Sequence, residues 1–353
     1  MRHDGGVPLT FPEPLRPGDT IGVTAPSSGV EDDLRPRLDH AVAVLRDRGF
    51  EVVLGECLGT PSHVSAPRRA RADELMSLLV DPDVVAVVPP WGGETATDLL
   101  TLLDFDVLAA CDPSWLVGFS DLSTLMLPIT LRSGWATLHG WNLMDTPYEP
   151  APGLLHWLDV AMAEPGATLT QRAATHCRSS GWDDYRADPT VSRMSLTEPT
   201  RWSVLGQDGP AGHDPVDVSG RLIGGCLDTL THLAGTPFGD VRAFGMEHAQ
   251  EGLIVYLEAA SANPFEVDRI LHGMTYAGWF DHANAVVIGR TPVPDAPGFT
   301  HHEAVADALG ELGIPVVLDG DFGHQQPCSA FVNGALARLV VDGDRQEITQ
   351  TLP

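Results

Sequence analysis

The chain has 353 residues, enough for two domains and a sizeable hydrophobic core. It carries 48 acidic and 21 basic residues, a formal net charge of −27, and every basic residue is an arginine. A surface this negative repels phosphate backbones and anionic membranes, so we expect neither a nucleic-acid partner nor a membrane.

The amino-terminal segment lacks the apolar run of a signal peptide, and no stretch approaches the length of a membrane span. The five cysteines are scattered without metal-ligand spacing, and the His301-His302 pair has no third ligand at such a spacing. These features predict a cytoplasmic protein with reduced thiols, no disulfide framework and no bound metal.

Strands and helices are expected to alternate over the first part of the chain. Apolar, β-rich runs predict strands at 19–25, 50–54, 84–88 and 115–118, and helical spacing predicts helices at 38–49, 68–80, 98–103 and from 121 onward. Alternation at this pitch predicts an α/β domain with a mainly parallel sheet covered on both faces.

The middle of the chain has a different amino-acid composition. From about 147 to 218, proline, glycine and polar residues dominate, with tryptophans at 157, 182 and 202. Beyond it we expect strands at 253–257, 285–289 and 315–318, helices at 264–277 and 302–312, and a closing hairpin after 337. The predicted division is an α/β domain (1–165), a connecting and substrate-loop region (166–218) and a C-terminal domain (219–353).

Four features that could carry chemistry follow apolar strands: Gly92-Gly93, Ser120, Glu258 and His324. Active groups in open α/β sheets collect at the carboxyl ends of strands. Each feature also has a plain structural explanation when taken alone. The glycines can form a tight turn, the serine can cap a helix, the glutamate can be a solvated strand end, and the histidine can be structural.

Taken together, a serine, a glutamate and a histidine supply a nucleophile, an orienting carboxylate and a general base. In this interpretation Ser120, Glu258 and His324 are catalytic, and the N–H groups of Gly93 and Asp121 form the oxyanion hole. The motif G-F-S-D around Ser120 differs from the G-x-S-x-G of α/β-hydrolases, so that fold is not indicated.

Several segments, in order along nearly the whole chain, resemble the LD-carboxypeptidase family of serine peptidases and, within it, the microcin C immunity branch. They are LRPGDTIGVTAPSS (15–28), RARADELMSLLVDPDVVAVVPPWGG (69–93), VGFSDLSTL (117–125), GRLIGGCLDTL (220–230), LEAASANPFEVDRIL (257–271) and DFGHQQP (321–327). The resemblance implies a doubly wound N-terminal α/β domain, like that of flavodoxins or glutamine amidotransferases. It also implies a smaller C-terminal α/β domain with β-barrel character, a Ser–Glu–His triad built across the two, a homodimer and no cofactor.

The resemblance also bears on the substrate. In the immunity branch an aromatic residue of the middle region stacks on the nucleotide of a peptidyl or aminoacyl adenylate, which makes Trp182 and Trp202 substrate-binding candidates together with Gly92. Two departures are Ala259, where murein-recycling members usually carry an acid, and Gln325, where a small hydroxyl residue is expected. In the alternative interpretation, both tryptophans have only a structural role and anchor a long loop to the core.

Two other functions stay open at this point. A murein tetrapeptide LD-carboxypeptidase would use the same triad and would need an arginine for the terminal carboxylate of its substrate. Arg186, Arg221 and Arg269 are the candidates. A non-catalytic protein that sequesters a small molecule is the third possibility.

Overall fold

The computed structural model describes residues 7–59, 62–206 and 214–353. The chain divides into two compact units. The first unit runs to Glu149 and adds His156–Pro165 and Trp182–Met194, and the second holds Pro150–Leu155, Gly166–Gly181 and Ser195–Pro353. The region 166–218, which we expected as a connection, is therefore divided between the two units.

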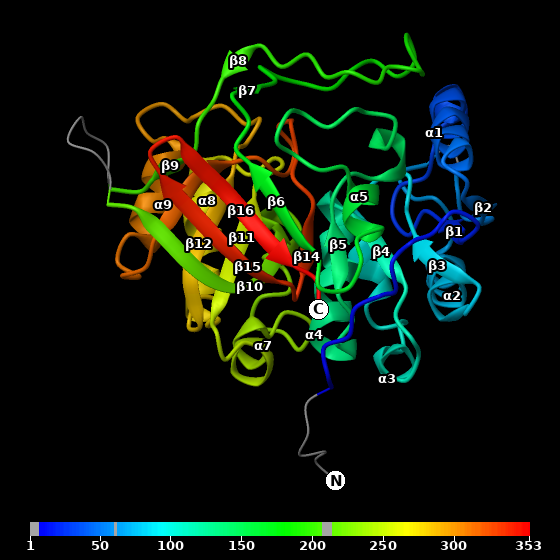
Figure 1. Ribbon diagram of the computed structural model, residues 1–353, viewed down its shortest axis with the longest axis horizontal. Helices are drawn as coiled ribbons and strands as arrows, with labels where there is room; N and C mark the ends of the chain where they lie inside the picture. Colours follow the sequence, from blue (N-terminus) through cyan, green and yellow to red (C-terminus); the bar gives the residue numbers. More distant parts are fainter. Residues whose placement is uncertain (1–6, 60–61, 207–213) are drawn as a thin grey trace. The chain divides into compact units, whose positions relative to one another are not determined.

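The first unit is built on parallel strands in the order β5-β4-β3-β1-β2 (Figure 1). Their bounds are β1 Thr20–Val23, β2 Glu51–Leu54, β3 Val84–Val87, β4 Trp115–Gly118 and β5 Thr137–His139. The helices of this unit are α1 Arg35–Asp47, α2 Arg68–Val80, α3 Phe105–Ala109, α4 Ser123–Ser133 and α5 Trp157–Ala161. The expected α/β architecture is confirmed.

Buried residues at helical spacing explain why the helices of this unit form where they do. In α1, Leu38, Ala41, Val42 and Leu45 all lie on the buried side. The helix expected at 98–103 is wrong, since the structure has only a 3-10 turn, η2, at Ala96–Leu99. Side chains from elsewhere satisfy the backbone there: Asp121 accepts a hydrogen bond from the N–H of Ala96.

The second unit is built on one mixed sheet in the order β6-β16-β15-β10-β11-β12-β13-β9. The central strands are β10 Val216–Cys226, β11 Leu253–Glu258, β12 Ala283–Gly289 and β13 Val316–Gly320, and they run parallel. The antiparallel strands are β6 Thr168–Arg172, β9 Ser203–Val204, β15 Leu336–Asp342 and β16 Arg345–Thr351. The shorter strands are β7 His176–Cys177, β8 Glu198–Pro199 and β14 Phe331–Asn333.

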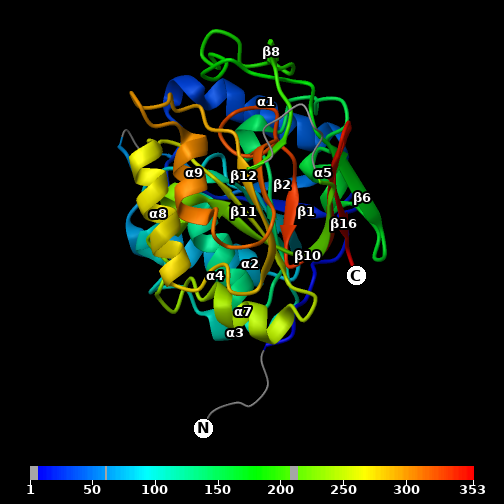
Figure 2. The same cartoon turned by 90° about the vertical axis from the view of Figure 1, so that its left-hand side faces the viewer.

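Among the residues that the structure describes, the second unit has four helices: α6 Leu227–Leu230, α7 Val241–His248, α8 Pro264–Tyr276 and α9 His301–Leu309. Figure 2 shows α8 and α9 side by side against β11 and β12. The core of the sheet is aromatic, since the rings of Tyr256, Phe322 and Phe331 meet edge to face with centroids 5.1–5.6 Å apart.

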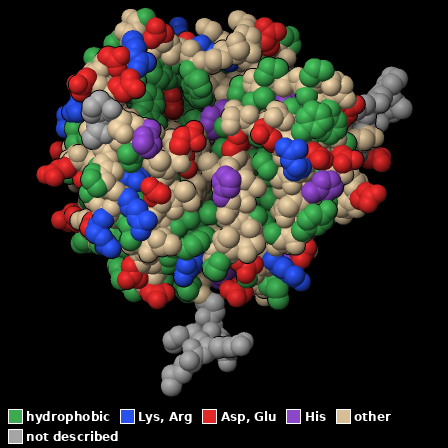
Figure 3. Space-filling model, turned by 180° about the vertical axis from the view of Figure 1, so that it is seen from behind, with side chains coloured by type: hydrophobic (Ala, Val, Ile, Leu, Met, Phe, Trp, Pro, Cys, Tyr) green, Lys and Arg blue, Asp and Glu red, His purple; other side chains and the backbone are tan. Residues whose placement is uncertain are grey.

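The surface agrees with the composition. On the face shown in Figure 3, acidic side chains are scattered over the whole surface with arginines interspersed. Among the residues that the structure describes, no helix is both long and apolar enough to span a bilayer.

Candidate active site

Ser120 lies directly after β4, at the first position of the 3-10 turn η3 (Ser120–Leu122). Its φ is 64°, and of the described non-glycine residues only Ser120 and Asp319 have positive φ. Phe119 takes the N-cap position, and its side chain makes no capping bond. The helix-capping role considered for Ser120 is therefore not what the structure shows. A serine in this backbone region costs about 1–3 kcal/mol, and such positions cluster at functional sites.

The glycine pair after β3 lies against this turn. A Cβ atom at Gly92 would come within 2.8 Å of Ser120 Cβ and 2.9 Å of the Asp121 nitrogen. Gly93 has φ of 143°, and a Cβ there would collide with the hydroxyl groups of Ser27 and Ser28. Only a glycine at 92 allows the backbone to approach Ser120 this closely, and only a glycine at 93 fits beside Ser27 and Ser28.

The carboxylate of Asp121 is used structurally. It accepts hydrogen bonds from the hydroxyl of Ser27 (2.6 Å), the N–H of Ala96 (2.8 Å) and the hydroxyl of Thr124 (3.2 Å). These bonds tie the turn to the segment that follows the glycine pair. These bonds involve the carboxylate, whereas the role predicted for Asp121 concerns its backbone N–H.

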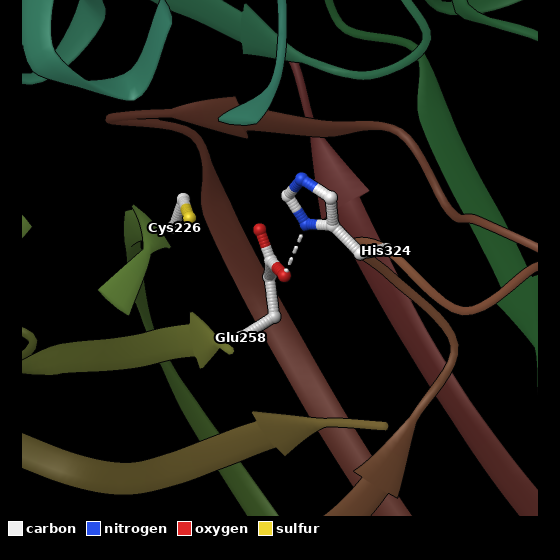
Figure 4. A group of neighbouring side chains, drawn as sticks. All are labelled: Cys226, Glu258 and His324. Carbon is white, nitrogen blue, oxygen red and sulfur yellow. Dashed lines mark hydrogen bonds and ion pairs between the residues drawn. The ribbon is translucent and has the colours of Figure 1, made fainter. Parts of the chain in front are cut away.

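The structure brings Glu258 and His324 together (Figure 4). Glu258 ends β11 and is 1% exposed, and His324 lies in the loop after β13. His324 Nδ1 and Glu258 Oε2 are 2.8 Å apart. A carboxylate that holds Nδ1–H leaves Nε2 unprotonated, which is the tautomer that a general base needs.

A buried ion pair holds the loop that carries His324. The guanidinium of Arg290 donates to Asp321 Oδ1 at 2.6 Å and to the carbonyls of Asp319 and Pro327 at 3.0 and 3.3 Å. Asp321 Oδ2 accepts from the N–H of Ala174 at 2.9 Å. Both ends of the loop are thereby fixed to the sheet.

The two tryptophans proposed for substrate binding have different surroundings. Trp182 is 40% exposed, and its ring lies 6.3 Å from that of Phe119, the neighbour of Ser120. Trp202 is 3% exposed, belongs to the aromatic core, and donates its Nε1–H to Asp321 at 2.7 Å. Trp202 therefore supports the His324 loop, and of the two tryptophans only Trp182 presents an exposed ring.

The segment that carries Trp182 is anchored to the first unit by a buried arginine. Arg37 of α1 donates to the carbonyls of Pro189 and Val191 at 3.1 and 2.7 Å. Its guanidinium also lies over the rings of Tyr148 and Tyr185, at 5.2 and 4.3 Å from their centroids. This part of the segment is thus anchored to α1 of the first unit.

Two of the three arginines considered for a substrate carboxylate already have acidic partners. Arg186 pairs with Glu31 and Asp33 at 2.6 and 2.5 Å, and Arg221 pairs with Glu251 at 2.7 Å. Arg269 is exposed on α8. None of these observations favours one of them as a carboxylate ligand.

A cavity of about 440 Å³ opens at the carboxyl ends of β11, β12 and β13. Glu258 and Gln325 line it on one side, and apolar residues of α8 and α9 line the other. The paired His301 and His302 face this cavity, and each lies beside a different carboxylate, Asp295 at 3.0 Å and Asp319 at 3.1 Å.

Sequence reasoning missed the residues that act through others, namely Arg37, Arg290 and Asp321. The last of these follows a predicted strand in Asp319-Gly-Asp-Phe-Gly-His324, so its position in a strand-end loop was a usable signal. The arginines gave no such signal, because an arginine within a helix or at a strand end is ordinarily solvated.

Comparison with known proteins shows the family to which the chain belongs. The LD-carboxypeptidase N-terminal domain matches residues 21–140, and the LD-carboxypeptidase C-terminal domain matches residues 219–339. The microcin C7 self-immunity protein MccF of Escherichia coli is 26% identical over 344 residues, covering 96% of this chain and 94% of that protein.

Solved structures agree on the fold. MccF in complex with aspartyl sulfamoyl adenosine superposes with a TM-score of 0.78 at 24% identity, covering 98% of this chain and 99% of that one. A muramoyltetrapeptide carboxypeptidase from Oxalobacter formigenes gives a TM-score of 0.68 at 24% identity, covering 95% and 99%. The chain belongs to the LD-carboxypeptidase family, and it is a hydrolase of that peptidase family.

Proposed function

We propose that the protein is a serine amidase in which the Glu258–His324 pair activates Ser120. The hydrogen bond of 2.8 Å between a buried carboxylate and a histidine in a strand-end loop is the observation that carries this proposal. The strained turn at Ser120, packed against Gly92, supports it independently.

The reaction follows from the roles of these groups. Ser120 Oγ attacks the carbonyl of the scissile amide while His324 Nε2 takes its proton. The N–H groups of Gly93 and Asp121 stabilise the oxyanion, by roughly 3 kcal/mol per donor. His324 then protonates the leaving amine, and a water molecule hydrolyses the acyl-enzyme by the same route. The proposed reaction uses no metal or organic cofactor.

The preferred substrate class is an aminoacyl or peptidyl nucleotide compound of the microcin C type, cleaved for detoxification or self-immunity. Trp182 supports this class, because its half-exposed ring offers a stacking surface and lies beside Phe119, the residue that precedes Ser120. Stacking of a base on an aromatic side chain contributes roughly 1–3 kcal/mol. We include the homodimer in the proposal, and sedimentation of the purified chain tests it.

Murein tetrapeptide cleavage is the second candidate, supported by the matching carboxypeptidase fold. The test is a competition assay in which wild type and Ser120→Ala are each incubated with an aspartyl sulfamoyl adenosine and with an L,D-tetrapeptide. We expect cleavage of the nucleotide compound, lost in Ser120→Ala. Cleavage of the tetrapeptide alone would instead indicate a function in cell-wall recycling. Binding of either compound without cleavage would favour a protein that sequesters its ligand.

Trp182 separates the two substrate classes further. In Trp182→Ala we expect kcat/KM for the nucleotide compound to fall about 5- to 100-fold, corresponding to the loss of one stacking interaction. Trp182→Phe is the matched control, because it keeps an aromatic ring at this position. An equal loss on nucleotide and tetrapeptide substrates would reduce Trp182 to a packing residue.

A further inference from the structure

Three donor atoms of different kinds meet at the carboxyl ends of neighbouring strands in the second unit. The thiol of Cys226, the carboxylate of Glu258 and the imidazole of His324 each place one possible ligand atom within 4.8 Å of the others (Figure 4). Cys226 ends β10, Glu258 ends β11, and the two residues are direct partners in the parallel pairing. The sheet itself therefore fixes the thiol beside the carboxylate.

Glu258 provides a second, independent observation. Its Oε2 bonds to His324, but its Oε1 is buried and has no hydrogen-bond partner among the described residues. A buried carboxylate oxygen without a partner is costly, since it has lost its water and gained nothing in exchange. A cation bound between the carboxylate and the thiol would satisfy it.

We propose that Cys226, Glu258 and His324 bind a thiophilic divalent cation of the Zn²⁺ class, and that this ion inhibits the enzyme. Sulfur, nitrogen and oxygen are the ligands that Zn²⁺ takes in proteins, and tetrahedral coordination leaves a fourth position for water. One Zn²⁺ with one thiolate and one carboxylate has no net charge, which suits a buried site.

The inhibition follows from the proton balance. As the metal–sulfur bond forms, the Cys226 thiol releases one proton to the solvent. The ion takes the place of the proton on His324 Nδ1, and that proton moves to Nε2, so the imidazole stays neutral. A histidine with Nε2 protonated cannot accept a proton from a serine, and the general base is lost. Only this consequence rests on the proposed function, whereas the site itself rests on geometry.

The cavity described above gives the ion a route. Glu258 lines this cavity, together with Leu227 and Gln325, the chain neighbours of the other two ligands. An entry path is one of the requirements for a metal site.

The test uses Co²⁺ and Zn²⁺ on the intact, metal-free protein. Co²⁺ bound to a thiolate absorbs strongly in the near ultraviolet through sulfur-to-metal charge transfer. We expect this band at one Co²⁺ per chain, its displacement by Zn²⁺, its loss in Cys226→Ala, and at least about tenfold weaker binding in Glu258→Gln. Cys111→Ser is the matched control, because Cys111 lies in the other unit and is the one cysteine that is not buried.

Absence of the band in wild type, or its persistence in Cys226→Ala, would overturn the proposal. Melting curves without metal show whether each variant is folded, and Cys226→Ser serves in place of the alanine variant if that one is not. In the activity arm, Zn²⁺ should inhibit the wild type reversibly with a chelator and inhibit Cys226→Ser at least about tenfold less, each measured against its own metal-free rate. The Co²⁺ band needs no substrate, so failure of this inference is distinguishable from failure of the proposed function.

Discussion

The two units hold their functional side chains in different ways. In the first unit, the backbone positions Ser120: a serine with φ of 64° packs against Gly92, and the charged residue of the turn, Asp121, is bonded to uncharged donors. In the second unit, charges position His324: a buried carboxylate bonds to its ring, and the Arg290–Asp321 pair clamps its loop.

This difference predicts different sensitivities. A side chain whose position is fixed by backbone geometry should tolerate substitutions that change the charge nearby. It should not tolerate substitutions that add atoms in the tight packing or that disfavour the observed φ. A position fixed by buried charges tolerates neither the loss of one partner nor its neutralisation. The predictions below test this contrast, beginning with the largest expected effect.

Glu258→Gln should reduce kcat by up to about 10⁴-fold, because an amide can hold the imidazole in the wrong tautomer and cannot stabilise its charged form. Steady-state kinetics with the preferred substrate measure the effect. Glu251→Gln is the control, since this carboxylate lies in the turn before the same strand and pairs with Arg221. Equal rates in Glu258→Gln and Glu251→Gln would remove Glu258 from the mechanism.

Arg290→Met should lower the free energy of unfolding by about 3–5 kcal/mol, because it leaves the buried Asp321 carboxylate without its ion partner. Urea denaturation measures the loss. The double variant Arg290→Met/Asp321→Leu removes both charges and should recover part of it. If Arg290→Met were as stable as the wild type, the clamp would not be what holds the His324 loop.

His156 makes the stability of the first unit depend on pH. Its burial lowers the pKa of the imidazole to about 4. Nε2–H donates to the Thr146 carbonyl and Nδ1 accepts from the N–H of Leu158, so the neutral ring is the bonded form. The unfolded chain takes up a proton below pH 6.5 and the folded chain only near pH 4. Stability should therefore fall between pH 6.5 and 4, by up to about 3 kcal/mol.

The measurement is urea denaturation at several pH values for wild type and His156→Asn. Asparagine keeps an acceptor at this N-cap position but does not titrate. Between pH 6.5 and 4, the free energy of unfolding of His156→Asn should therefore fall by up to about 3 kcal/mol less than that of the wild type. Parallel curves for the two proteins would contradict the assignment.

Ser120→Gly should be more stable than Ser120→Ala by about 1 kcal/mol, because glycine adopts positive φ without strain and alanine does not. Thermal denaturation of the two inactive variants compares them directly. Equal stability would mean that the backbone at Ser120 is not strained, and the contrast between the units would be lost.

The features that could be predicted from the sequence are those that depend on a local pattern of residues. Most strands of the parallel sheets were expected within about two residues, namely β1, β2, β3, β4, β11, β12 and β13, whereas β5 and β10 were not predicted. Strand-end positions pointed to Ser120, Glu258 and His324. The helix predicted at 98–103 is wrong. Its apolar residues have helical spacing, but the structure has a 3-10 turn at Ala96–Leu99, whose backbone is held by Asp121, a residue remote in sequence.

Other features could not be predicted because they depend on pairing across the sheet. Cys226 and Glu258 are neighbours only through the register of β10 and β11, so a search for ligand spacing along the sequence does not find them. Trp182 and Trp202 looked alike in the sequence, yet one is 40% exposed and the other lies in the core. Trp202 is buried by packing in the core of the second unit, which its local sequence does not reveal.

The central claim is that the acid–base pair of the second unit activates the serine of the first. The most direct measurement is the rate at which a fluorophosphonate adds to the intact protein, followed by mass spectrometry. The account predicts a single adduct on Ser120 in the wild type, and labelling at least about a hundredfold slower in His324→Ala. Labelling of another residue, or equal rates in the two proteins, would contradict it.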